Sequence, residues 1–130
     1  MPSWVKNRIT LHGADQKEID KVIDFLRSKD SEVDFNNIIP MPAELMNTEV
    51  GSKADTAWAY YQAKELGNYV ELYKMLTYEW VKAAKITTRE GLLDYLLKEH
   101  PNIEVYGKEL YELEKIYGCH DWYEWSCEHW

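Results

Sequence analysis

The chain has 130 residues and a formal net charge of −8, since 15 Lys and Arg residues stand against 23 Asp and Glu residues. Its aromatic content, with 6 Trp and 10 Tyr residues, argues against an intrinsically disordered protein, and its length predicts a single domain covering residues 1–130. The acidic balance argues against direct binding of nucleic acid or of an anionic membrane, because both carry the same sign of charge.

The first predicted element is a strand. Residues 4–12 alternate between apolar and polar side chains, which is the period of a strand buried on one face. The side chains expected to face the core are those of Val5, Ile9 and Leu11. Gly13 interrupts the alternation and predicts a tight turn.

A helix is predicted to follow from Asp15, because Glu18 stands three residues later, as in a capping box. Its apolar stripe comprises Ile19, Val22, Ile23 and Leu26. Residues 33–45 predict an ordered loop, since their two prolines fit neither a helix interior nor a central strand. We expect residues 46–54 to be a mobile linker.

The middle of the chain is predicted to be helical. Residues 53–66 would form one helix that Gly67 stops, and residues 68–84 another, with apolar side chains at steps of three or four. A third helix is expected to begin at Thr87 and to end before Pro101.

Three further elements complete the predicted order. Ile103 and Val105 alternate with polar residues and predict a second, short strand. A helix over residues 108–117, which Gly118 stops, and a last helix capped by Asp121 follow. The expected fold is therefore α+β and mainly helical, with a few-stranded sheet.

The sequence also bears on the compartment. The first residues are not the apolar core of a signal peptide, and no apolar run approaches the ~20 residues of a membrane-spanning helix. Cys119 and Cys127 are too few for the disulfide framework of a small secreted protein. We therefore expect an intracellular protein with reduced thiols.

Four side chains that could bind zinc lie within eleven residues near the C-terminus: Cys119, His120, Cys127 and His129. Zinc needs its ligands to converge on a tetrahedron. The segment has no Cys-x-x-Cys pair, and in a helix residues 127 and 129 point about 200° apart. We therefore interpret the four as ordinary packed or surface residues and predict no metal and no cofactor.

The same segment is rich in tryptophan. On a helix its side chains would form two faces, one with Trp122, Trp125 and His129 and one with Tyr123, Cys127 and Trp130. Indole rings supply a large apolar area with a polar edge, so the helix either seals the core against the first strand or presents an aromatic platform to a partner. The lack of flanking cations argues against stacking on single-stranded nucleic acid.

Negative charge is concentrated in the last quarter of the chain. Residues 1–98 contain 13 basic and 15 acidic residues, a net charge of −2, whereas residues 99–130 contain 2 and 8, a net charge of −6. This predicts either a solvated acidic face or a surface that docks on a basic groove of another protein. The partner-binding carboxylates would be those of Glu104, Glu109, Glu112, Glu114, Asp121, Glu124 and Glu128.

No catalytic constellation is visible, because the sequence has no glycine-rich phosphate loop, no Gly-x-Ser-x-Gly and no His-Glu-x-x-His. Asp34 with Asn36, or Glu44, could serve as metal ligands of a nuclease, but their spacing does not favour it. The histidines expected to be surface or capping residues rather than bases are His12, His100 and His120. We predict no catalytic residue.

Three separated stretches carry a family resemblance. The chain opens with Met1-Pro2-Ser3-Trp4 and Asn7-Arg8-Ile9, its middle contains Asn37-Ile38-Ile39-Pro40-Met41-Pro42, and its C-terminal block begins with Trp122-Tyr123-Glu124-Trp125 and ends at Trp130. In this order they resemble the YubB-type ferredoxin-like family of phages, plasmids and other mobile elements, whose function is unknown.

The resemblance implies a partial ferredoxin-like sheet with residues 46–118 as a variable helical insertion. It also implies a mobile-element protein in the cytoplasm of a bacterial host. The shared residues expected to pack together are Trp4, Ile38, Pro40, Trp122 and Trp130. The family has no catalytic residues to carry over.

Together these features predict a non-enzymatic accessory protein that inhibits a host defence nuclease, as anti-CRISPR and anti-restriction proteins do. Its partner would be a CRISPR effector or a restriction enzyme with a basic nucleic-acid-binding surface. The alternatives are a metal-dependent nuclease or RNA-processing enzyme, and a phage assembly or self-associating structural protein.

Overall fold

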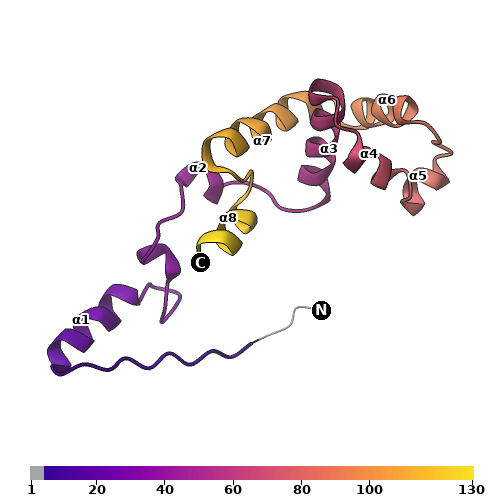
Figure 1. The fold of residues 1–130 in the computed structure, drawn as a ribbon. Helices are drawn as coiled ribbons and strands as arrows, with labels where there is room; N and C mark the ends of the chain where they lie inside the picture. Colours follow the sequence, from indigo (N-terminus) through magenta and orange to yellow (C-terminus); the bar gives the residue numbers. More distant parts are fainter. Residues whose placement is uncertain (1–4) are drawn as a thin grey trace. The chain divides into compact units, whose positions relative to one another are not determined.

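The computed structural model describes residues 5–130, and this part of the chain contains eight α-helices, one short 3₁₀ helix and no β-strand (Figure 1). It divides into two compact units, residues 1–40 and residues 41–130. That residues 1–130 form one domain stays a prediction, and each unit is described by itself. Within the described residues, no helix is both long and apolar enough to cross a membrane.

The first unit consists of an extended segment, α1 (Gln16–Leu26) and η1 (Phe35–Asn37). Asp15 caps α1 as predicted, because its carboxylate accepts a hydrogen bond of 2.9 Å from the Lys17 N–H. The apolar stripe of α1 and the extended segment border a common shallow hollow. No side chain of α1 or η1 is fully buried, so this unit has little core of its own.

The prediction of a sheet is wrong. The described residues of the first predicted strand, 5–12, are extended but join no ladder, and Val5 and Ile9 are exposed. A strand is stabilised by hydrogen bonds to a neighbouring strand, and the alternation of side chains cannot supply that neighbour. Trp4, which would begin this strand, lies outside the described residues.

The second predicted strand, at Ile103 and Val105, is instead the first turn of a helix. Ile103 is 4% exposed and Val105 62% exposed. The Tyr106 N–H donates to the Asn102 carbonyl at 3.0 Å, which is the i to i−4 bond of an α-helix. Two apolar residues are too few to establish a period, and in the helix they point in nearly opposite directions, so that Ile103 is buried and Val105 is exposed. Over the part of the chain that the structure describes, the α+β, ferredoxin-like fold is therefore replaced by an all-helical one.

The second unit contains the remaining helices: α2 (Ala43–Met46), α3 (Ser52–Leu66), α4 (Val70–Met75), α5 (Glu79–Ala83), α6 (Arg89–Glu99), α7 (Ile103–Tyr117) and α8 (Trp122–His129). Gly67 and Gly118 end α3 and α7 with φ of 66° and 75°. This is the left-handed conformation that glycine adopts at helix C-termini, and it confirms both predicted stops.

Two predicted boundaries differ from the structure. The single helix expected over residues 68–84 is broken between α4 and α5, where the Thr77 hydroxyl donates to the Lys74 carbonyl at 2.6 Å. Such a local side-chain bond competes with the helical ladder. The cap of α6 is Thr88 rather than Thr87, since its hydroxyl accepts from the Gly91 N–H at 3.1 Å.

The main core lies where α3 packs along α7. Four of the buried side chains of α3 are alanines, which let the partner helix approach: Ala54, Ala57, Ala59 and Ala63. The closest approach is at Gly107 of α7, where an added Cβ would lie 2.7 Å from the Ala57 carbonyl oxygen and 2.7 Å from the Tyr61 Cβ. The backbone of one helix thus rests on the backbone of the other.

A smaller core joins α2 to α8 and contains Met41, Leu45, Cys119 and Trp125. The buried indole of α8 is therefore that of Trp125, whereas Trp122 and Trp130 are 40% and 43% exposed. Residues 46–54 are not the linker expected, because Met46 ends α2 and Ser52 already begins α3. Between them, the Thr48 hydroxyl accepts a hydrogen bond of 2.9 Å from the Trp122 N–H.

We expect Gly107→Ala to destabilise the chain by about 1–3 kcal/mol, because the added methyl meets the fixed backbone of α3. This loss exceeds the gain of roughly 0.5–1 kcal/mol that Ala offers over Gly in a helix. Guanidinium unfolding followed by circular dichroism measures the difference. Lys108→Ala, at the neighbouring exposed position, is the control and should change stability little. A Gly107→Ala chain at least as stable as the parent would contradict this packing.

Candidate functional site

The structure separates the seven acidic residues predicted to bind a partner into three groups. The first is Glu104 alone, whose carboxylate accepts hydrogen bonds from Lys64 Nζ at 2.7 Å and from the Tyr60 hydroxyl at 3.2 Å. The Lys64 ammonium, and then the Tyr60 hydroxyl, lower the pKa of Glu104 below its ordinary value. Glu104 thus has partners within the fold, although its side chain is half exposed.

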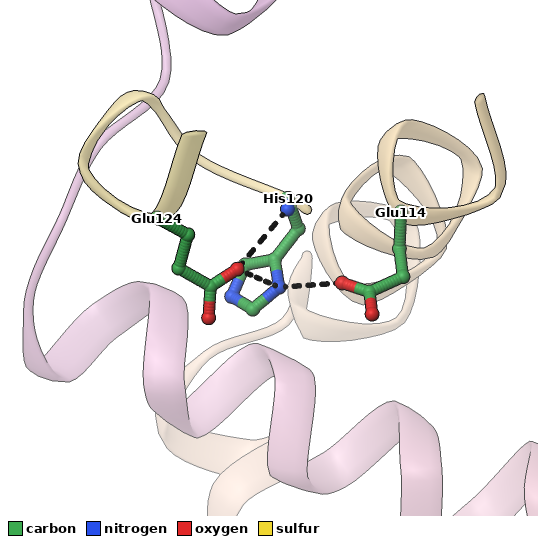
Figure 2. Close-up of side chains that lie close together, drawn as sticks. All are labelled: Glu114, His120 and Glu124. Atoms are coloured by element: carbon green, nitrogen blue, oxygen red, sulfur yellow. Dashed lines mark hydrogen bonds and ion pairs between the residues drawn. The ribbon is translucent and has the colours of Figure 1, made fainter. Parts of the chain in front are cut away.

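The second group is gathered around a histidine. His120 lies between α7 and α8, and its Nδ1 is 3.0 Å from Glu114 Oε2 and 3.3 Å from Glu124 Oε2 (Figure 2). Its Nε2 is 3.7 Å from Asp121 Oδ2. We call Glu114, His120, Asp121 and Glu124 the His120 cluster. The third group, Glu109, Glu112 and Glu128, stays exposed on α7 and α8.

Local structure explains how the His120 cluster forms. Gly118 ends α7 in the left-handed conformation and turns the chain back, so that the last turn of α7 faces the first turn of α8. Asp121 caps α8 by accepting from the Glu124 N–H at 2.8 Å, which confirms the predicted cap. Glu124 in turn accepts from the His120 N–H at 3.4 Å.

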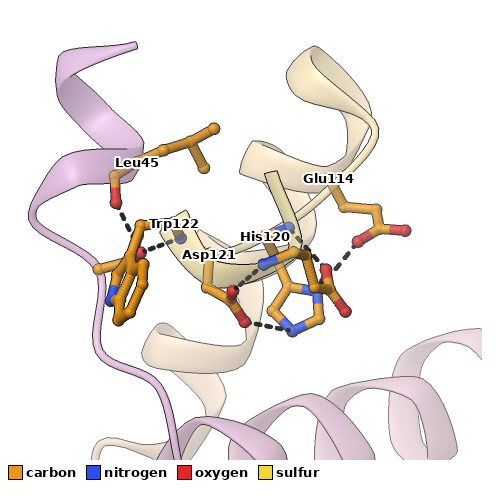
Figure 3. Close-up of polar contacts among 7 residues, drawn as sticks. Leu45, Glu114, His120, Asp121 and Trp122 are labelled. Atoms are coloured by element: carbon orange, nitrogen blue, oxygen red, sulfur yellow. Dashed lines mark hydrogen bonds and ion pairs between the residues drawn. The ribbon is translucent and has the colours of Figure 1, made fainter. Parts of the chain in front are cut away.

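A further bond attaches this turn to the segment after α2. Figure 3 shows the beginning of α8 at Trp122 close to Leu45, with Asp121 and His120 beside it. The Thr48 hydroxyl accepts from the Trp122 N–H and itself donates to the Leu45 carbonyl at 2.6 Å. The backbone of the turn is therefore held from outside as well as by its own caps.

His120 is not the surface or capping residue that the sequence predicts, because it is only 7% exposed. Its ring stacks on Trp58 of α3, with 4.7 Å between ring centroids and 21° between planes. Trp58 and Tyr61 of α3 both stack on Tyr111 of α7. The four rings therefore form a row in the order Tyr61, Tyr111, Trp58, His120. The stacking fixes the plane of the imidazole and leaves its two nitrogens facing carboxylates.

The His120 cluster can hold a proton or a cation at Nδ1. Two carboxylate oxygens lie within reach of this nitrogen, and because a carboxylate only accepts, a hydrogen bond to either one needs the proton on Nδ1. Asp121 is 6% exposed and therefore does not belong to an accessible acidic surface, contrary to the prediction. The side chains of Glu114 and Glu124 are 38% and 46% exposed, so the cluster opens to solvent on their side.

The cluster contains no activated thiol. Cys119 precedes His120 but is buried, and burial, followed by the nearby carboxylates, raises its pKa to about 11. A neutral thiol is neither a good nucleophile nor a metal ligand. The four zinc ligands considered from the sequence form no group of close ligand atoms within the described residues, and His129 Nδ1 instead lies 2.9 Å from the Trp125 carbonyl oxygen.

The other side chains considered from the sequence have structural roles. Asp34 caps η1 by accepting from the Asn36 N–H at 2.9 Å. Glu44 accepts a hydrogen bond from Tyr117, which raises the pKa of that tyrosine. His12 is exposed, and His100 is the C-cap of α6, as predicted for a capping residue. None of the groups of close metal-ligand atoms among the described residues contains Asp34, Asn36 or Glu44, the side chains considered as ligands of a nuclease.

Sequence reasoning missed the His120 cluster. The only local signal is the spacing His120-Asp121-x-x-Glu124, which places a histidine just before a capping aspartate and a glutamate in the first helical turn. Glu114 and Trp58 carry no such signal, because the turn at Gly118 and the packing of α3 on α7 bring them in.

No protein-family model, curated protein or solved structure matches this chain. The resemblance to the YubB-type family therefore stays a prediction, while the ferredoxin-like fold it implied is overturned by the helical structure.

We expect the two thiols to differ sharply in reactivity. At pH 8 a pKa near 11 leaves only about 0.1% of Cys119 as thiolate, whereas Cys127 is exposed. Ellman's reagent should therefore modify one thiol of the folded chain quickly and the second only after unfolding in guanidinium. The Cys127→Ser chain should show no fast reaction, and two equally fast thiols would contradict the burial of Cys119.

Proposed function

We propose that this chain is a non-enzymatic binding protein that docks an acidic face of α7 and α8 on the basic, nucleic-acid-binding surface of another protein. The proposed partner class is a bacterial defence nuclease, such as a CRISPR effector or a restriction enzyme. The chain would then act as an inhibitor carried by a mobile element.

The observation that supports this proposal most directly is the outward face of α7. Val105, Glu109, Glu112 and Ile116 follow one another at steps of four, three and four residues, so they share one side of the helix. All four are exposed, Val105 at 62% and Ile116 at 68%. The two aliphatic side chains would give a partner an apolar contact, and the carboxylates between them would supply its charged surroundings.

The exposed carboxylates of Glu109 and Glu112 on α7, and of Glu128 on α8, are available to a partner. Glu109 and Glu128 form no ion pair with any described residue. Glu112 pairs with Lys115 at 3.2 Å, but both side chains are about half exposed, and such surface pairs are worth roughly 0–1 kcal/mol. A basic partner can therefore take over this contact at little cost.

The expected mechanism is electrostatic. Carboxylates spaced along one helix face would occupy the sites where a nuclease binds phosphates. Long-range attraction would speed the encounter, and the exposed aliphatic side chains would add contact area after docking. Such an association weakens as salt rises, because exposed charges are screened over about 10 Å at 0.1 M ionic strength.

We expect the triple variant Glu109→Lys, Glu112→Lys, Glu128→Lys to lose partner binding by about tenfold or more and to lose most of its salt dependence, because each change turns attraction into repulsion. The measurement is binding of the tagged chain to a CRISPR effector or restriction enzyme from an expressing bacterial lysate, eluted with a salt gradient. Release of the enzyme by added DNA or guide RNA would support occupation of its nucleic-acid site.

The matched control reverses three exposed acids elsewhere in the second unit, at Glu65, Glu79 and Asp94. It has the same net charge as the test variant and should keep its binding. The proposal is overturned if both variants bind equally, if DNA does not compete, or if only the chain itself is recovered, which would favour self-association.

A further inference from the structure

The His120 cluster contains a set of metal ligands that the acidic-face proposal does not use. Within the described residues, Glu114, His120 and Glu124 are the one group whose ligand atoms all lie within 4.8 Å of one another. They come from three consecutive pieces of structure, the last turn of α7, the turn after it and the first turn of α8. We infer that these three side chains bind one divalent transition-metal ion, through His120 Nδ1 and one oxygen of each carboxylate.

The separations in the cluster fit a metal. Zinc bonds to imidazole nitrogen and carboxylate oxygen are about 2.0–2.1 Å long, so ligand atoms around a tetrahedral ion stand about 3.3 Å apart. The distances from Nδ1 to the two carboxylate oxygens are 3.0 and 3.3 Å. One imidazole with two carboxylates is a borderline to hard ligand set, suited to zinc and to the ions before it in the first row.

A second feature is independent of these distances. In metal sites, the nitrogen of a ligating histidine that does not bind the metal commonly faces a carboxylate, which fixes the tautomer of the ring. When a metal takes Nδ1, the ring proton stays on Nε2, whose carboxylate neighbour is Asp121 Oδ2 at 3.7 Å, slightly beyond direct hydrogen-bond distance. The stacked ring of Trp58 fixes the plane of the imidazole. The orientation of Nδ1, the nitrogen that would bind the metal, is thus set before an ion binds.

The charges favour a dication as well. Three carboxylates surround one imidazole, so the cluster has a net charge of −2 when the ring is protonated and −3 when it is neutral. A divalent ion bound to the neutral ring brings this to −1. His120 and Asp121 form the buried side of the site, whereas Glu114 and Glu124 are partly exposed and leave a path for entry and for water as a fourth ligand.

The consequence is structural. The ligands join the end of α7 to the start of α8, so the ion would hold α8 at a fixed angle to α7 and stabilise the folded chain by mass action. This inference does not rest on the acidic-face proposal, because none of the exposed carboxylates Glu109, Glu112 and Glu128 is a ligand.

The test is calorimetric titration of the tag-free, EDTA-treated full chain with zinc chloride alone, with thermal unfolding measured with and without zinc. We expect one zinc ion per chain and a higher midpoint temperature with zinc. Glu114→Gln and Glu124→Gln should each weaken binding by at least about tenfold, and His120→Gln should abolish it. Circular dichroism of each variant in EDTA identifies any that fail to fold, and the inference then rests on those that do.

Asp121→Asn tests the orienting role separately. Asparagine caps a helix as well as aspartate does, so α8 should still begin at the same residue, yet zinc affinity should fall by about tenfold because the carboxylate facing Nε2 is lost. The matched controls are Glu112→Gln on α7 and Glu128→Gln on α8, which should bind zinc as the parent does.

Cobalt gives a spectroscopic check of ligand type. Co²⁺ bound by nitrogen and oxygen shows visible d–d bands without the near-ultraviolet charge-transfer band of a thiolate ligand, and Cys127→Ser should leave this spectrum unchanged. The inference is overturned if the chain binds no zinc, if the folded Glu114, His120 and Glu124 variants bind it unchanged, or if binding is lost with Cys127.

Discussion

The close packing of α3 on α7 is the constraint on which the rest of the second unit depends. At Gly107 no side chain separates the two helices, and the alanines of α3 keep the contact narrow. Such an approach fixes the rotation of α7 about its axis, because a turn in either direction would drive a larger side chain into the α3 backbone. The face of α7 that remains outward, from Val105 to Ile116, follows from that rotation.

The same packing creates the environment of His120. Because α3 lies along α7, Trp58 reaches the turn after α7 and covers one face of the imidazole. The Thr48 hydroxyl holds the other end of this turn through the Trp122 N–H. His120 would be a solvated turn residue in an isolated helix pair, but these contacts bury it. Burial makes its polar partners important for stability, because a buried polar group without a partner raises the free energy of the folded state.

The acidic C-terminal third has more than one physical role. Glu104 accepts hydrogen bonds from Lys64 and Tyr60, and three carboxylates face His120. The carboxylates of Glu109, Glu112 and Glu128 are exposed to solvent. The acidic residues behind the net charge of −6 over residues 99–130 therefore do not form one surface. The two proposals draw on different parts of it, the binding face on the exposed carboxylates and the metal site on the gathered ones.

Much of the local structure could be read from the sequence, because caps and stops depend on neighbours along the chain. Asp15 and Asp121 cap helices through bonds to N–H groups two or three residues away, and Gly67 and Gly118 stop helices through their own left-handed conformation. The tertiary structure decided what depends on distant partners. Within residues 5–130 no segment pairs with residues 5–12 to make a strand, and Ile103 is helical because it packs in the α3–α7 core. His120 became a candidate ligand because Glu114 and Trp58 were folded onto it, and no spacing along the chain encodes contacts made by packing between helices.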